Sequence, residues 1–117
     1  MLIVLFEVTV KKNCMDKYLT LAGELREYLS KQEGFIRSER FLSLVDENKL
    51  LSLSVWENEE AVEKWRNLGE HRIKQGLGRE DIFESYNITV TSPIRTYTKV
   101  DRSEAPKDSN IYFGFNW

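Results

Sequence analysis

The chain has 117 residues, the size of one globular domain rather than two. Hydrophobic residues make up 41% of it and charged residues 31%, so there is enough apolar material for a core, and the composition excludes a disordered chain. Lys and Arg number 17 against 19 for Asp and Glu, a net charge of -2. The basic excess of a protein that binds nucleic acid or an anionic membrane is therefore missing, and we expect neither partner.

The first residues and the single cysteine bear on where the protein works. Residues 1–6 are apolar, but no positive segment precedes them, and Glu7 ends the run well short of a signal peptide or a membrane span. Cys14 has no second cysteine with which to form a disulfide, so we expect the reducing environment of the cytoplasm. One histidine and one cysteine fall short of a ligand set, so we predict no metal site.

Two periodicities organise the first half of the chain. Every even position from Leu2 to Val10 is apolar, which predicts a strand with one face in the core. Apolar residues then recur at steps of three and four from Met15 to Leu29, which predicts an amphipathic helix. Gly34 suits the left-handed conformation that follows a helix.

Residues 35–44 and 49–57 predict two strands joined by a polar turn at 46–48. The second of these strands has two unlike faces. One carries Leu51, Leu53 and Val55, and the other carries Leu50, Ser52, Ser54 and Trp56. We expect the first, more apolar face to point towards the core.

A second helix is expected to begin after Asn58, a favourable N-cap residue followed by two glutamates. Its apolar stripe consists of Ala61, Val62, Trp65 and Leu68, and glycines weaken or break it between His71 and Arg79. A long final strand is predicted over residues 86–100, with Pro93 making its middle an edge or a bulge.

The end of the chain differs in composition from the rest. Residues 101–110 resemble a linker, whereas residues 111–117 are rich in aromatic side chains that are unfavourable in water. We predict a domain over residues 1–98 and a tail over 99–117 that docks on its own or a partner subunit. The alternative is a frayed terminus.

The order strand, helix, strand, strand, helix, strand predicts an α+β fold, the ferredoxin-like βαββαβ arrangement with an antiparallel sheet and both helices on one face. The other sheet face is then uncovered, and Ile3, Leu5, Leu50 and Trp56 make it apolar. We expect a second copy to cover it, giving a homodimer in which two sheets form a dimeric α+β barrel. A monomer with scattered surface hydrophobics is the alternative.

One stretch resembles a known family. It contains Trp56-Glu57-Asn58-Glu59-Glu60-Ala61, Trp65-Arg66-Asn67, Glu70-His71-Arg72, Gln75, Gly78-Arg79, Phe83 and Tyr86. This pattern resembles the antibiotic biosynthesis monooxygenase (ABM) domain family of dimeric α+β barrels, over residues 2–97. The resemblance implies the fold, and it implies activities that range from cofactor-free oxygenases of aromatic substrates to haem-degrading enzymes and members without known activity.

The haem-degrading members carry an asparagine on the first strand and a histidine about ten residues after a tryptophan of the second helix. This chain departs from that pattern. Phe6 or Glu7 stands at the asparagine position, and His71 follows Trp65 by only six residues. The resemblance therefore favours cofactor-free oxygenation over haem chemistry.

Candidate catalytic groups lie around the second helix. His71 is the only histidine, hence the only side chain that ordinarily titrates near neutrality, and we assign it acid–base chemistry. Arg72 and Arg79 are expected to stabilise a substrate anion, with Gln75 binding beside them. The alternatives are a helix-end histidine bonded to a backbone carbonyl, and arginines paired with neighbouring acids.

Trp56, Trp65 and Tyr86 are the candidate substrate-binding aromatic residues, because two tryptophans at the sheet and the helix could stack a flat ligand. The alternative is that they are core residues, as tryptophan at such spacing usually is. The predicted function is a cofactor-independent monooxygenase acting on a small aromatic or quinol-type molecule. The alternative is a non-catalytic dimeric module of the same fold.

Overall fold

The computed structural model describes residues 1–76 and 82–114, and for residues 72–76 it describes the backbone only. Seven elements follow one another along the chain: β1 (Leu2–Val10), α1 (Met15–Leu29), β2 (Phe35–Leu42), β3 (Lys49–Trp56), α2 (Glu59–Gly76), β4 (Phe83–Thr91) and α3 (Lys107–Tyr112). The first six are the predicted βαββαβ order.

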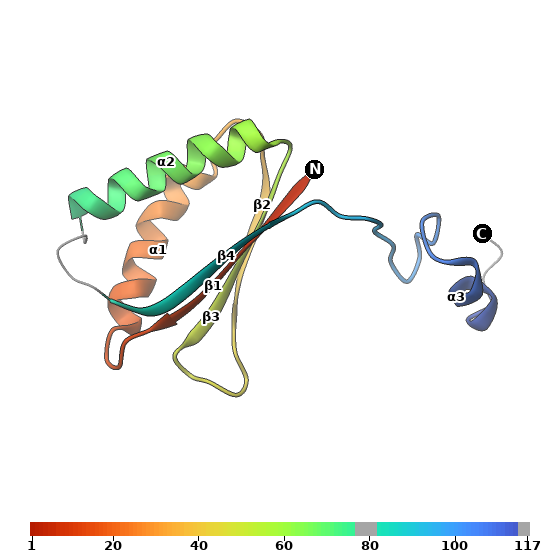
Figure 1. Ribbon diagram of the computed structural model, residues 1–117, viewed down its shortest axis with the longest axis horizontal. Helices are drawn as coiled ribbons and strands as arrows, with labels where there is room; N and C mark the ends of the chain where they lie inside the picture. The colour runs from red at the N-terminus through yellow and green to blue at the C-terminus, as the bar shows by residue number, and fades with distance from the viewer. Residues whose placement is uncertain (77–81, 115–117) are drawn as a thin grey trace.

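The strands form one antiparallel sheet in the order β2-β3-β1-β4. Both long helices, α1 and α2, lie on the same face of this sheet (Figure 1). The predicted α+β ferredoxin-like architecture is confirmed. None of the described helices is both long and apolar enough to span a membrane.

The register of the strands decides which residues face the helices. Val8 of β1 pairs with Leu50 of β3, and Leu2 pairs with Trp56. Because side chains alternate across a strand, the even positions of both strands share one face. Val8 and Leu50 pack in a core cluster with Tyr18 and other residues of α1, so this is the helix-facing side.

The prediction for the faces of β3 was therefore wrong. Leu51, Leu53 and Val55 lie on the sheet face opposite the helices, and Leu50 and Trp56 lie beneath the helices. The rule that the more apolar face is the core face fails here, because serines on the helix-facing side line a cavity instead of filling a core.

The core proper is small and occupies one end of the helix–sheet interface. It consists of Val8, Val10, Tyr18, Leu21, Leu50 and Ile82, which are at most 6% exposed. Rings of Phe6, Phe83 and Tyr86 extend it along the sheet through edge and tilted contacts. The rest of the interface is left for the cavity.

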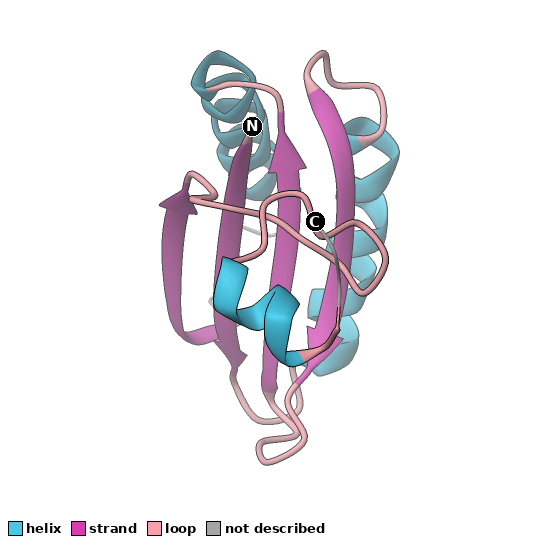
Figure 2. Ribbon diagram, turned by 90° about the vertical axis from the view of Figure 1, so that its right-hand side faces the viewer, coloured by secondary structure: helices cyan, strands magenta, loops and turns pink. Residues whose placement is uncertain are grey.

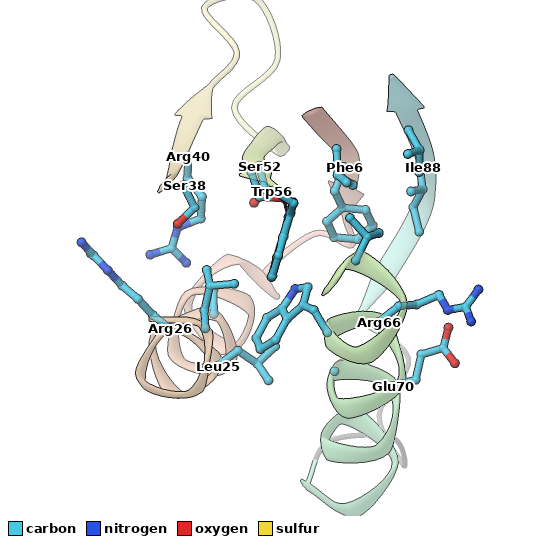
Figure 3. A pocket seen from close by; sticks show the side chains of 18 of the residues that line it. Phe6, Leu25, Arg26, Ser38, Arg40, Ser52, Trp56, Arg66, Glu70 and Ile88 are labelled. Carbon is cyan, nitrogen blue, oxygen red and sulfur yellow. Dashed lines mark hydrogen bonds between the residues drawn. The ribbon is translucent and has the colours of Figure 1, made fainter. Parts of the chain in front are cut away.

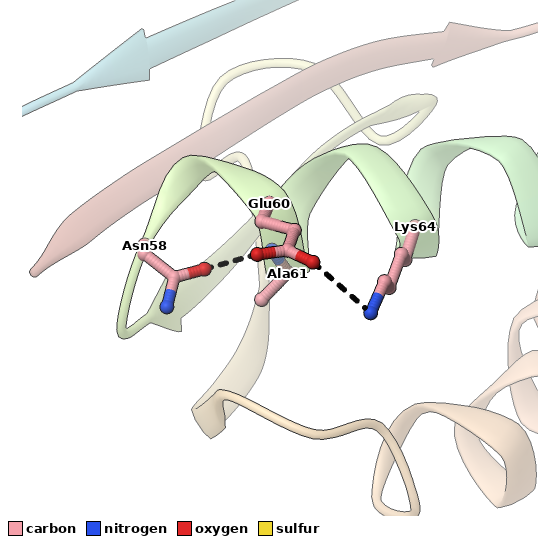
Figure 4. Close-up of polar contacts among 4 residues, drawn as sticks. All are labelled: Asn58, Glu60, Ala61 and Lys64. Atoms are coloured by element: carbon pink, nitrogen blue, oxygen red, sulfur yellow. Dashed lines mark hydrogen bonds and ion pairs between the residues drawn. The ribbon is translucent and has the colours of Figure 1, made fainter.

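The left-handed conformation of Gly34 and the N-cap Asn58 are confirmed, although α1 already ends at Leu29 and Gly34 directly precedes β2. Gly34 has φ 85°, and a Cβ atom at that position would lie 2.6 Å from the Cβ of Ala61 in the first turn of α2. The side chain of Asn58 caps α2, since its Oδ1 accepts a hydrogen bond from the amide of Ala61 at 2.9 Å. Figure 4 shows this cap beside the Glu60–Lys64 ion pair of 3.3 Å.

The second half departs from the predicted boundaries at the final strand. Helix α2 is continuous from Glu59 to Gly76, inside the interval 71–79 where glycines were expected to weaken or break it, and Gly78 and Arg79 lie outside the described residues. The final strand ends at Thr91 instead of continuing to Val100. Thr91 pairs with Ile3, at the start of β1, so there is no neighbouring strand left to pair with, and Pro93 follows without an amide hydrogen.

Beyond Thr91 the chain leaves the sheet and projects away from the helices (Figures 1 and 2). The predicted linker, residues 101–110, contains a buried arginine, Arg102, and the start of the short helix α3, which extends to Tyr112. The Arg102 guanidinium donates hydrogen bonds to Asn110 Oδ1 at 3.0 Å and Ser109 Oγ at 2.8 Å. The boundary between residues 98 and 99 and the docking of the tail stay predictions.

Candidate functional site: a cavity between sheet and helices

A cavity of about 890 Å³ lies between the sheet and the two long helices. Its volume falls within the ~300–1,000 Å³ typical of small-molecule sites. All four strands and both helices contribute to its walls, and Figure 3 shows side chains that line it. The site is therefore the part of the interface where the two helices do not pack directly on the sheet.

Small polar residues keep the floor of this cavity low. Ser38, Ser52 and Ser54 occupy helix-facing positions of β2 and β3, where larger apolar side chains would otherwise meet the helices. Val4 and Phe6 of β1 continue the floor. Serines at these alternating positions leave space that a leucine would fill, so the cavity is a property of the strand sequence itself.

Two tryptophans form the apolar wall. Trp56 is completely buried, and its ring lies 6.2 Å from that of Trp65 with an angle of 30° between the planes. The indole Nε1 of Trp56 donates a hydrogen bond of 2.9 Å to Ser54 Oγ, which fixes the orientation of the ring. The ring of Phe35 contacts Trp56 edge-on, with the ring centroids 5.4 Å apart. The wall is therefore aromatic.

Charged groups lie at the two sides of the cavity. Arg40 of β2 and Arg26 of α1 lie on one side, and Arg66 and Glu70 of α2 lie on the other (Figure 3). Atom Nη1 of Arg40 is buried and has no hydrogen-bond partner in the described part of the protein. Burial raises the pKa of the Tyr18 hydroxyl above its ordinary value, and the positive charge of Arg40 opposes that rise.

The predicted substrate-binding residues divide into two groups. Trp56 and Trp65 both line the cavity, and Trp56 is at the same time a completely buried core residue. Tyr86 is 60% exposed and contacts Phe6 and Phe83, at the edge of a second, smaller pocket of about 260 Å³. The structure therefore brings the tryptophans together and leaves Tyr86 apart from them.

The predicted catalytic residues are less fully described. His71 is exposed on α2, next in sequence to the cavity-lining Glu70. Arg72 and Gln75 lie in α2, but their side chains are outside the described part of the chain, and Arg79 is outside it altogether. Their roles stay predictions. Within residues 1–76 and 82–114, no group of three His, Cys, Asp or Glu residues is placed to hold a metal ion.

Sequence reasoning missed Arg40, Tyr18 and the floor serines. An arginine in a predicted strand resembles an ordinary solvated charge. Serines that alternate with leucines resemble the solvent-exposed face of a strand. One signal was available. Ser52, Ser54 and Trp56 occupy every second position and therefore share one face of a strand, and this combination is typical of neither a packed core nor a solvated surface.

Comparison with known proteins agrees with this architecture. A model of the antibiotic biosynthesis monooxygenase family matches residues 1–73. Over 90 residues the sequence is 37% identical to the jasmonate monooxygenase ABM of Pyricularia oryzae, an alignment that covers 77% of this chain and 42% of the relative. The chain thus spans less than half of that protein.

Solved structures share the fold. SnoaB, a cofactor-independent oxygenase from Streptomyces nogalater, superposes with a TM-score of 0.68 at 14% identity, covering 81% of this chain and 94% of SnoaB. The protein Rv0793 of Mycobacterium tuberculosis gives a TM-score of 0.70 at 12% identity, covering 83% and 98% of the two chains. The family match and the shared fold lead to one conclusion: this chain belongs to the antibiotic biosynthesis monooxygenase family.

Proposed function

We propose that this protein is a monooxygenase-like enzyme whose small, largely apolar substrate binds in the cavity between the sheet and the helices. The observation that carries the proposal is the cavity of about 890 Å³ with a tryptophan wall, in a member of a monooxygenase family. A packed interface in this place would have favoured a structural module. The names of the jasmonate monooxygenase and of SnoaB add support for oxygenation.

The chemistry that suits such a site is oxidation of an activated methylene group by dioxygen. A base removes a proton from the methylene, and the resulting carbanion or enolate, kept away from bulk water, reacts with dioxygen. The methylene becomes a carbonyl: the substrate loses two hydrogens and gains one oxygen, and the second oxygen leaves as water. The substrate itself supplies all the electrons, so the reaction balances without a cofactor.

We propose His71 as the acid–base group, because it is the only histidine and lies next to the cavity-lining Glu70. Arg72 and Arg79 would stabilise the substrate anion, with Gln75 and Tyr86 as further substrate contacts. His71→Ala should then lower kcat by about 100-fold or more, because a general base contributes at least that much. Unchanged turnover, with substrate binding intact, would assign the proton transfer to another group.

The competing function is a non-catalytic module that binds a small molecule. Anthrone separates the two, since it is flat, weakly acidic and has an activated methylene; jasmonic acid is a second probe suggested by the name of the relative. Protein and probe are incubated under isotopically labelled dioxygen, and the product is analysed by mass spectrometry against a protein-free sample. Label incorporated above that background by the wild type, and reduced in Trp65→Ala, supports the enzyme. Binding of both probes without incorporation supports the module.

We propose further that the protein acts as a homodimer. The sheet face opposite the helices carries the partly exposed Ile3, Leu5, Leu51 and Leu53, an apolar surface that no described helix covers (Figure 1). A second copy of the same face would remove it from water. Light scattering tests this directly: a mass of 13.8 kDa in solution would contradict the dimer.

A further inference from the structure

One guanidinium nitrogen at the cavity, Nη1 of Arg40, is buried without a hydrogen-bond partner among the described residues. Arg40 pairs with Ser52 across the β2–β3 ladder and shares its helix-facing side, which is why a residue of an edge strand reaches the interior. Its Nη1 is buried and makes no hydrogen bond within the described residues. An arginine donor taken out of water and left unpaired is unfavourable, so this atom is positioned for an acceptor that arrives with a ligand.

The protein does not provide that acceptor from its own acids. Glu39 neighbours Arg40 in sequence, but it pairs with Leu53 and so belongs to the opposite face of the sheet. Glu59, Glu63 and Glu70 line the cavity from α2, whereas Arg40 lies on the α1 side with Arg26 (Figure 3). Among the described residues, Arg40 makes no ion pair. The cavity thus has a cationic side next to α1 and, along α2, a side on which three glutamates outnumber Arg66.

The surroundings of Arg40 fit a planar, singly charged group. A guanidinium binds a carboxylate through two parallel N–H donors, and the hydroxyls of Ser38 and Ser52 lie on the same floor to complete such a site. The three glutamates of α2 that line the cavity disfavour a more highly charged ligand such as a phosphate monoester. Trp56 and Trp65 leave the remainder of the ligand in an apolar, flat environment.

We propose that Arg40 is the carboxylate anchor of this cavity, and that its natural ligand is a monocarboxylic acid with a flat or alicyclic apolar body. The inference rests on the proposed function, since it names the substrate class of the same site. It assigns recognition to the β2–α1 side, remote in sequence from the predicted catalytic group at His71. The carboxylate would therefore orient the ligand while the reacting carbon lies nearer to α2.

The test compares acids with their methyl esters, which keep the body and remove the charge. Jasmonic acid, 2-naphthoic acid and their methyl esters are titrated against the whole protein, with quenching of tryptophan fluorescence as the signal. The wild type should bind the acids at least about tenfold more tightly than the esters. Arg40→Met should remove that difference by weakening only the acids, and Arg40→Lys should restore part of it.

Arg37→Met is the matched control. Arg37 stands on the same strand but pairs with Val55, on the face away from the cavity, so its loss should leave both affinities unchanged. Equal binding of acids and esters by the wild type, no binding of any acid, or unchanged acid affinity in Arg40→Met would each overturn the anchor. A phosphate monoester that binds more tightly than the acids would also overturn it.

The two proposals can fail separately. If the acids bind through Arg40 but no labelled oxygen enters any probe, the anchor stands and the monooxygenase function fails. If anthrone, which has no carboxylate, is oxidised while the acids bind equally well to the wild type and to Arg40→Met, the monooxygenase function is supported and the proposed carboxylate anchor is wrong. Far-UV circular dichroism of Arg40→Met confirms that any loss of binding occurs in a folded protein.

Discussion

Replacing Ser52 by leucine should stabilise the fold and block the cavity at the same time. Ser52 lies on β3 between Phe6 of β1 and Arg40 of β2, at the centre of the cavity floor. Leucine replaces a hydroxyl by three carbon atoms. At about 0.8 kcal/mol for each buried CH₂-sized group, complete burial would add roughly 2 kcal/mol to the free energy of unfolding. Because Ser52 is half-buried, about 1 kcal/mol is the expected gain.

The same three carbons occupy space that the ligand needs. Overlap with a bound molecule is unfavourable by about 1–3 kcal/mol, which corresponds to an affinity roughly ten- to a hundredfold lower. Urea denaturation followed by circular dichroism gives the stability, and fluorescence titration with 2-naphthoic acid gives the affinity. Ser92→Leu, at an exposed position beyond β4, is the matched control and should change neither quantity.

Two results would refute this reasoning. A loss of about 1 kcal/mol or more in Ser52→Leu would mean that the space is not there, since an overpacked core is destabilised. A gain in stability with unchanged affinity would mean that the ligand binds elsewhere. Natural proteins commonly give up stability at functional sites, and a cavity that is kept by serine where leucine would stabilise is an instance of that trade.

Three further predictions concern the fold around the cavity. Gly34→Ala should lower the free energy of unfolding by about 2 kcal/mol, because alanine is strained at φ 85° and its Cβ would lie 2.6 Å from that of Ala61; urea denaturation measures this. Asn58→Ala should cost about 1 kcal/mol through loss of the α2 cap, and Asn58→Asp should restore it in the same assay. The Tyr18 pKa is raised on folding, so the folded state holds its proton more tightly and stability should fall as pH rises above ~10, where the unfolded chain ionises. Tyr18→Phe should flatten that fall, and an equally steep loss in the variant would contradict the assignment.

Local signals in the sequence predicted much of the fold. The alternation in β1 and the three-and-four spacing in α1 each act within one element, and both elements occur with the predicted bounds. Gly34 and Asn58 likewise act through their own backbone or a neighbouring turn. Such signals are independent of tertiary context, which is why they can be read from one sequence.

The cavity could not be predicted in the same way, because it depends on which residues meet across elements. The face of β3 that contains Leu51, Leu53 and Val55 is the more apolar, yet Ser52 and Ser54 face the helices. Register with β1 decides this, and register is a non-local property. The position of Arg40 follows from the same pairing. The wrong prediction of the β3 core face and the failure to predict Arg40 in the cavity therefore have one cause.

The inverted polarity of the sheet has a consequence for stability. Part of its helix-facing side lines the cavity instead of packing against the helices. Its more apolar side, on which Leu5 and Leu53 lie opposite each other, is not covered by a helix of the same chain. If a second copy covers that side, folding and association are coupled, and stability depends on protein concentration. Each tenfold dilution should then lower the apparent free energy of unfolding by about 1.4 kcal/mol, because a factor of ten in concentration has that value. With a urea m-value of about 1–3 kcal/mol/M, the midpoint should fall by roughly 0.5–1.4 M per tenfold dilution.

Leu53→Asp should abolish this dependence by charging the uncovered face, while the exposed Lys12→Asp should preserve it. A midpoint that is the same over a hundredfold range of concentration would show that one chain folds alone, and the proposed dimer would have no part in holding the cavity open.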